Sequence, residues 1–97
     1  MRIIALRTLR EYWITYANAR DSLQAWYDHV HQADWSSPED LASDYGRDAL
    51  LPDQRAVFKI KGDQYRLVIR INYRDRLVFI RFIGTHAEYN RIDATKI

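Results

Sequence analysis

The spacing of the apolar residues changes near residue 55, and this change constrains the fold more than any other feature. Before it, apolar side chains recur every three or four residues; after it, they alternate with polar ones, most clearly over residues 65–73. A period of 3.6 indicates helices, and a period of 2 indicates strands with one buried face. The chain is therefore predicted to fold as helices followed by an antiparallel sheet.

The last third contains three strand-like runs, at residues 57–61, 65–73 and 77–83. Gly62-Asp63 and Arg74-Asp75 supply the two hairpin turns between them. The third run is apolar on both faces except at Arg81, a pattern typical of a central strand.

A short helix is predicted directly after the third run. Gly84 should end the strand, and Thr85 with Glu88 three residues later matches a capping box, so the helix begins near His86. The last third thus ends in a strand, a cap and a helix.

The first half is mainly helical. Apolar stripes with a helical period and the start signal Ser37-Pro38 predict the helices, and a short apolar run at the start predicts a strand that joins the sheet. On the second helix Trp26 and Tyr27 are expected to be core residues. The expected elements are a strand at 1–6, a helix at 8–16 capped by Thr8, a helix at 18–33, a helix at 37–45 ending at Gly46, and a connecting loop at 47–54.

Together these elements predict a single α+β domain over residues 1–97. Its N-terminal strand and two to three helices pack on a twisted, mainly antiparallel sheet, with a short C-terminal helix. A chain of 97 residues suits one hydrophobic core. The absence of cysteine, of a signal peptide and of a long apolar run predicts a cytoplasmic protein that does not enter a membrane.

The charges divide unevenly between the two halves. Residues 1–54 hold five Lys or Arg against nine Asp or Glu, and residues 55–97 hold ten against four, within a net charge of +2. Such segregation favours a polyanion such as RNA as the partner of the second half. A chance asymmetry in a small domain is the alternative.

Seven residues of the basic half are candidates for a functional site. Cations on successive strands can bind phosphate on a shared sheet face, although any one of them alone is more simply an ordinary surface residue. Arg81 is the exception, because an arginine in an apolar strand is costly unless it reaches a partner or lines a cleft. His86 can transfer a proton, and Tyr89 lies one helical turn further, where it can stack on a base or pack in the core. The candidates are Lys59, Lys61, Arg66, Arg70, Arg81, His86 and Tyr89. His29 and His31, two apart on a helix, point in different directions and predict no metal site.

These segments resemble the HigB toxins of bacterial type II toxin–antitoxin systems, members of the RelE-like superfamily. The resemblance rests on residues 70–74 (RINYR), 78–83 (VFIRFI) and especially 84–89 (GTHAEY). It implies a RelE-like fold and an mRNA interferase that cuts message on the translating ribosome. It also implies a HigA-type antitoxin with a helix-turn-helix fold, and contact with operator DNA only through that antitoxin.

The resemblance implies roles for the candidates as well, with no cofactor and no metal. Lys59, Lys61, Arg70 and Arg81 would hold and stabilise the phosphate, Tyr89 would orient the nucleotide, and His86 would transfer the proton. Two other functions remain open at this point: an RNA-binding module that does not cut, and an inactive domain that only binds an antitoxin.

Overall fold

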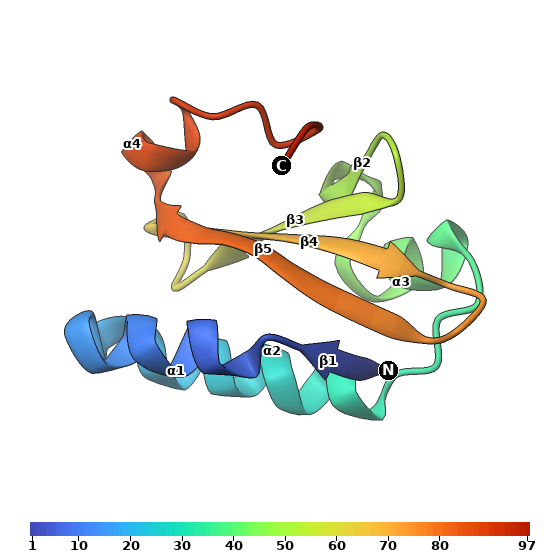
Figure 1. Cartoon of the computed structure of the whole chain (residues 1–97), viewed down its shortest axis with the longest axis horizontal. Coiled ribbons are helices and arrows are strands. Elements are labelled where there is room, and N and C mark those ends of the chain that lie inside the picture. The colour runs from blue at the N-terminus through green and yellow to red at the C-terminus, as the bar shows by residue number, and fades with distance from the viewer.

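A five-stranded sheet lies at the centre of the structure, a computed structural model that describes residues 1–97 (Figure 1). In the sheet β1 pairs in parallel with β5, whereas the other neighbours are antiparallel. The N-terminal strand thus joins the sheet and β5 is central, as predicted. The strands, in the spatial order of the sheet, are β1 (Arg2–Ile4), β5 (Leu77–Thr85), β4 (Tyr65–Asn72), β3 (Arg55–Ile60) and β2 (Leu50–Leu51).

Helices lie on both sides of the sheet but cover it unequally. The two longest helices, α1 and α2, run beneath it, while α4 and the C-terminal segment lie on the opposite side (Figure 1). The predicted α+β architecture is therefore confirmed. The helices are α1 (Leu6–Thr15), α2 (Arg20–Gln32), α3 (Pro38–Tyr45) and α4 (His86–Tyr89), with 3₁₀ turns η1 (Ala17–Ala19) and η2 (Arg47–Ala49).

The hydrophobic core forms between the helices and one face of the sheet. Nineteen buried residues make one cluster. Trp26 of α2 is 4% exposed and meets Phe58 of β3 edge to face, with ring centroids 5.5 Å apart. Tyr27 is half-buried and packs against the same cluster. Both aromatic residues are thus core residues, as the apolar stripe predicted.

Aromatic packing also fixes the ends of the helical layer. Tyr12 of α1 stacks on Tyr16 with ring centroids 4.5 Å apart, and the Tyr65 hydroxyl of β4 donates a hydrogen bond to Asn18. Burial, with a smaller contribution from the Glu88 carboxylate, raises the pKa of Tyr12 to about 12. These contacts anchor α1 to the sheet beside α4.

Two predicted details of the first half are wrong. Thr8 does not cap the first helix: α1 begins at Leu6, after Ala5, which has the left-handed backbone conformation (φ 71°) that ends β1. The second helix begins at Arg20 because η1 precedes it. In each case a change of chain direction, and not a side-chain cap, sets the start.

The segment at 47–54, predicted to be a loop, contains η2 and the short strand β2. Its Leu50 and Leu51 pair with Ala56 and Arg55 and extend the sheet by one strand. Two residues are too few for any alternation to be visible in the sequence. β5 also continues through Gly84 to Thr85, because Tyr65 and Arg66 of β4 still pair with it there.

Candidate active site

One face of the sheet carries no helix except α4, and four of the predicted cations lie on it. Along β3 and β4 they alternate with core residues such as Phe58 and Leu67, so their side chains point away from α1 and α2. Lys59 pairs directly with Arg66 across the two strands. We call this surface the free face; the candidate cations on it are Lys59, Arg66, Arg70 and Arg81.

Arg81 reaches the free face through a β-bulge. Ile80 pairs with Ile69 and Phe82 pairs with Val68, so Arg81 is the extra residue of β5 and has no partner on β4. The bulge explains why an arginine is tolerated in an apolar strand: its side chain leaves the ladder and is exposed.

Arg81 and Arg70 line the same hollow on the free face. It has a volume of about 260 Å³, and its other lining residues are two polar and two apolar ones, namely Gln54, Asn72, Ile71 and Phe79. Neither guanidinium has an ion-pair partner within the chain. Two unpaired guanidinium groups beside one hollow suit an anion such as a phosphate.

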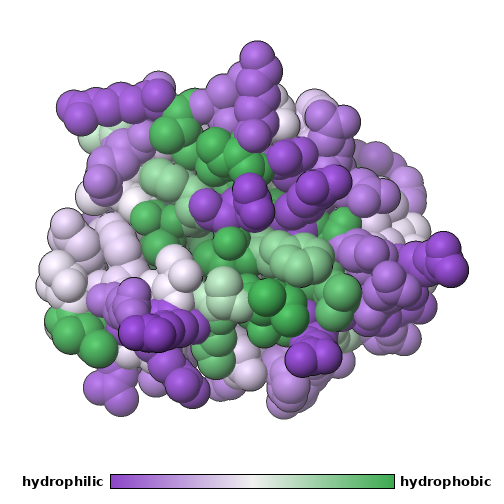
Figure 2. All heavy atoms as spheres, viewed as in Figure 1, coloured by the Kyte–Doolittle hydropathy of each residue, from purple (hydrophilic) through white to green (hydrophobic).

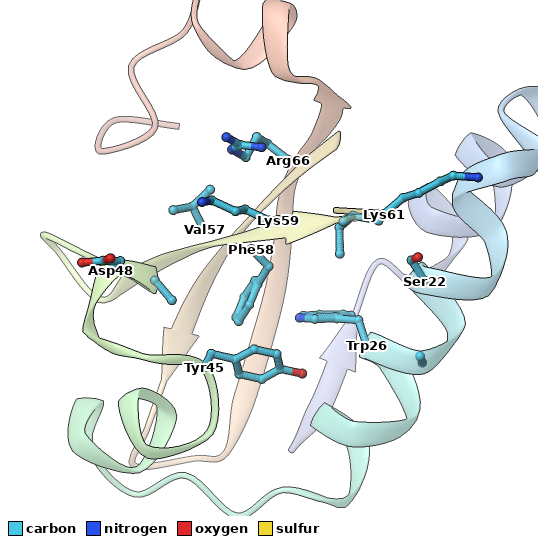
Figure 3. A pocket seen from close by; sticks show the side chains of 12 residues that line it. Ser22, Trp26, Tyr45, Asp48, Val57, Phe58, Lys59, Lys61 and Arg66 are labelled. Carbon is cyan, nitrogen blue, oxygen red and sulfur yellow. The ribbon is translucent and has the colours of Figure 1, made fainter. Parts of the chain in front are cut away.

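Lys59 and Lys61 point in different directions. Figure 3 shows Lys59 on the same side of β3 as Arg66, whereas Lys61 extends away from both. Lys61 lies in the turn after β3 and has the left-handed conformation (φ 52°), which breaks the alternation of the strand. Lys61 therefore does not lie on the free face with the other predicted phosphate-binding residues.

The largest hollow follows the edge of β3 that β2 leaves unpaired. It has a volume of about 590 Å³ and lies between β3 and α2 (Figure 3). Trp26 and Phe58 line its apolar side, and Lys59 and Lys61 are the exposed cations at its rim. This groove adjoins the free face through Lys59.

Arg66 is the one buried charged residue, with 8% of its surface exposed. Its Nη2 atom lies 2.6 Å from Asp63 Oδ1, and its guanidinium carbon lies 5.9 Å from the centre of the Tyr89 ring. An arginine this enclosed is held in place by its partners, and its contacts link the β3–β4 turn to α4.

His86 and Tyr89 are presented by α4, and the predicted capping box is confirmed. The Glu88 N–H donates to Thr85 Oγ1 at 3.1 Å, and the Thr85 N–H donates to Glu88 Oε1 at 2.8 Å. Hydrogen bonds from Thr85 hold the pKa of the Glu88 carboxyl below its usual value. Glu88 therefore serves α4 as a charged cap, and the proton-transfer candidate on this helix is His86, whose side chain is 46% exposed.

Tyr89 packs against the free face. Its ring centroid lies 6.5 Å from that of Phe82, and the ring also contacts the Arg66 guanidinium. Gly84 makes this arrangement possible, because a Cβ atom there would lie 2.5 Å from the Phe82 ring. Tyr89 remains half-buried, so it combines a packing contact with an accessible edge.

Asp63 is a site residue that the sequence reasoning assigned only to a turn. One carboxylate oxygen contacts Arg66, and the other lies 3.5 Å from His86 Nδ1. Only the folding of α4 back onto the β3–β4 turn reveals this pairing. Asp63 thus contacts both Arg66 and His86, and Arg66 in turn contacts Tyr89, while Arg70 and Arg81 form a second group further along the sheet.

The C-terminal segment lies over part of the free face (Figure 1). Arg55 Nε donates to the Ile97 carbonyl oxygen at 2.7 Å, and Ala94 is buried. Val68 is fully buried although its side chain lies outside the main core cluster, which agrees with cover from this segment.

Figure 2 shows apolar side chains gathered near the middle of this view, with hydrophilic ones around and between them. No helix is both long enough and apolar enough to cross a bilayer. No three His, Asp or Glu side chains lie close enough together to share a metal ion.

A match to a family model identifies the family of this chain. The model of the HigB toxins, described as the RelE-like toxic component of a toxin-antitoxin system, matches residues 19–92. The chain belongs to the HigB toxin family. The match covers most of the core and all seven candidate residues, and it confirms the resemblance seen in the sequence.

One curated relative extends the similarity to nearly the whole chain. The chain is 24% identical over 94 residues to the mRNA interferase HigB of Escherichia coli O6:H1 (strain CFT073), covering 95% of this chain and 91% of the relative. The helix α1, which the family model leaves out, therefore falls within the region shared with another HigB protein.

Proposed function

We propose that this HigB-family chain is an endoribonuclease toxin that cleaves mRNA on the translating ribosome and is neutralised by a HigA-type helix-turn-helix antitoxin. The observation that carries the proposal is the free face itself. It combines unpaired cations, an exposed histidine and a half-buried tyrosine within one domain. Family membership and the similarity to an mRNA interferase support the same activity.

In the proposed reaction the ribose 2′-OH attacks the adjacent phosphorus atom. The new 2′-O–P bond forms as the P–O5′ bond breaks; the hydroxyl proton leaves to a base, and the 5′ oxygen gains a proton from an acid. His86 is the one histidine among the candidates, and an imidazole can both accept and donate a proton, so we assign it a proton-transfer role. No metal ion or cofactor takes part in this proposal.

The cations stabilise charge at the phosphorus. Arg81 and Arg70, on one hollow, hold phosphate oxygens through guanidinium N–H groups. Lys59 and Lys61 attract the backbone from the rim of the groove at β3. Tyr89 stacks on or orients the nucleotide. Arg66, which is enclosed by Asp63 and Tyr89, adds its positive charge from behind these two residues.

The partners follow from this proposal. The message and the ribosome meet the basic half, and the antitoxin blocks that access. Operator DNA is contacted only through the antitoxin. The acidic first half, with nine Asp or Glu against five Lys or Arg, offers a complementary surface for a basic part of the antitoxin.

The decisive experiment is to incubate purified protein with translating ribosomes and map new message ends, with free RNA in a parallel reaction. We expect cuts within the message only when ribosomes are present. Steeply salt-dependent binding without cutting would instead indicate an RNA-binding module. If the protein neither binds nor cuts RNA, the remaining function is that of an antitoxin-binding domain.

Two variants locate the site in the same assay. His86→Ala and Arg81→Ala should each relieve growth arrest and lower cleavage by about 100-fold, the lower end of what a positioned proton-transfer group contributes. The matched controls are His31→Ala and Arg20→Ala, which remove an exposed histidine and an exposed arginine from α2. Full toxicity of both site variants would place the site elsewhere.

A further inference from the structure

The turn between β3 and β4 reaches across to α4 through one carboxylate. Asp63 Oδ1 lies 2.6 Å from Arg66 Nη2, and Asp63 Oδ2 lies 3.5 Å from His86 Nδ1. The His86 backbone N–H also donates to the Gln64 carbonyl oxygen of the same turn at 3.1 Å. Two separate contacts thus fix His86 to this turn.

The ion pair with Arg66 gives Asp63 a defined orientation. The Asp63 side chain is 60% exposed and by itself would rotate freely, but the Arg66 side chain is only 10% exposed. Arg66 also donates through Nη1 to the Asp63 backbone carbonyl oxygen at 3.0 Å. A guanidinium that contacts both the carboxylate and the backbone of one residue holds that residue in one geometry.

We propose that Asp63 is a positioning residue of this site, which holds the His86 ring with Nδ1 toward its carboxylate and the Arg66 guanidinium against Tyr89. The inference rests on the proposed ribonuclease function. An imidazole beside a carboxylate carries its N–H on the facing nitrogen, so the neutral ring keeps its lone pair on Nε2. Asp63 therefore selects which nitrogen of His86 exchanges a proton with RNA.

The chain offers a matched control in Asp75. Asp63 and Asp75 lie in the two turns that flank β4, and each carboxylate has a side-chain partner. The Asp75 carboxylate accepts from Asn72 Nδ2 at 3.0 Å, at the end of β4 away from α4. Substitution of Asp75 removes a turn carboxylate without touching His86.

The first test needs no activity. Nitrogen-15 NMR of the imidazole rings should show neutral His86 of the unaltered chain protonated on Nδ1. In Asp63→Ala the proton should move toward Nε2, whereas Asp75→Ala should leave His86 unchanged, and exposed His31 serves as an internal reference. An Nε2–H ring in the unaltered chain would overturn the proposal, even if no Asp63 variant folds.

The second test uses ribosomes programmed with a defined message. Asp63→Asn should lower kcat by about tenfold, part of what an oriented proton-transfer group contributes, and leave KM within about twofold. Asp75→Asn should change neither constant. Wild-type kcat in a folded Asp63→Asn variant would refute the positioning role.

The two proposals fail in different ways. If the unaltered protein cuts no message but shows His86 protonated on Nδ1, the ribonuclease function fails and the contact made by Asp63 stands. If the protein cuts message and neutral His86 is protonated on Nε2, only the role of Asp63 fails.

Discussion

The two faces of the sheet are built from the same strands, β3, β4 and β5, but they differ in what covers them and in the side chains they carry. The face toward α1 and α2 carries almost all of the 19-residue core. The opposite face carries Lys59, Arg66, Arg70 and Arg81, and only α4 and the C-terminal segment lie on it (Figure 1). Because a strand alternates its side chains, neighbouring residues of β3 and β4 fall on the core side and on the candidate-site side in turn.

The largest contrast should appear between a core aromatic and an exposed cation. Trp26→Ala should lower the free energy of unfolding by about 3–5 kcal/mol, because it removes a large side chain that is 4% exposed. Arg81→Ala should change it by less than about 0.5 kcal/mol, since its side chain is exposed at a bulge. Urea unfolding of both variants measures the difference, and equal losses would contradict the division between faces.

A matched pair of valines tests the division at constant side-chain size. Val78 and Val68 are both fully buried, but Val78 belongs to the core cluster and Val68 lies on the free face. Val78→Ala should lower the free energy of unfolding by about 2 kcal/mol, and Val68→Ala by about 1 kcal/mol. The loss at Val68 is smaller because the C-terminal segment can move to fill part of the cavity that the missing methyl groups leave. A larger cost at Val68, measured by thermal and urea unfolding, would mean that the C-terminal segment is as rigid as the core.

The capping box should respond to acid before the core does. The pKa of Glu88 is lowered by hydrogen bonds from Thr85, so its contribution is present at neutral pH and is lost as the pH falls through that lowered pKa. Glu88→Ala should cost about 1 kcal/mol of α4 stability, confined to that helix. Amide NMR signals of α4, followed from neutral pH to acid, report this loss.

The control for Glu88 is Glu11→Ala, which removes an exposed ion pair with Arg7 on α1. Its effect should be about 0.3–0.5 kcal/mol and should leave the signals of α4 in place. Loss of α4 in the Glu11 variant would show that α4 depends on the helical layer and not on its own cap.

The smallest effect at neutral pH comes from the buried tyrosines on the core side. Burial raises the pKa of Tyr12 and of Tyr45 to about 12. Their stabilising effect is complete below pH 10, where unfolded tyrosine is neutral, and is lost as the pH rises toward 12. Ultraviolet titration should show late ionisation of both residues, and Tyr12→Phe should remove one of these late steps.

Much of the fold could be predicted from local patterns. The alternation at 65–73 gave β4, and the Thr85–Glu88 pair gave α4, because both depend on residues close in the sequence. β2 could not be predicted because two leucines show no period. The start of α1 could not be predicted either, because the left-handed Ala5 results from the turn after β1.

The site was harder to predict than the fold. The basic strands indicated which cations to consider, and three of them, Lys59, Arg70 and Arg81, lie exposed on the free face. The burial of Arg66 and the partnership of Asp63 with His86 arise from contacts between a turn and a helix more than 20 residues apart. The functional roles of all seven candidates remain predictions for the cleavage assay.

The pairing of β1 with β5 has a consequence for biosynthesis. β1 is the first strand to be made, and its partner β5 is the last. Ile3 and Ile4 therefore have no strand to pair with until β5 has been synthesised. Because β5 also carries Arg81 and leads into α4, the candidate residues cannot come together until β5 and α4 have been made.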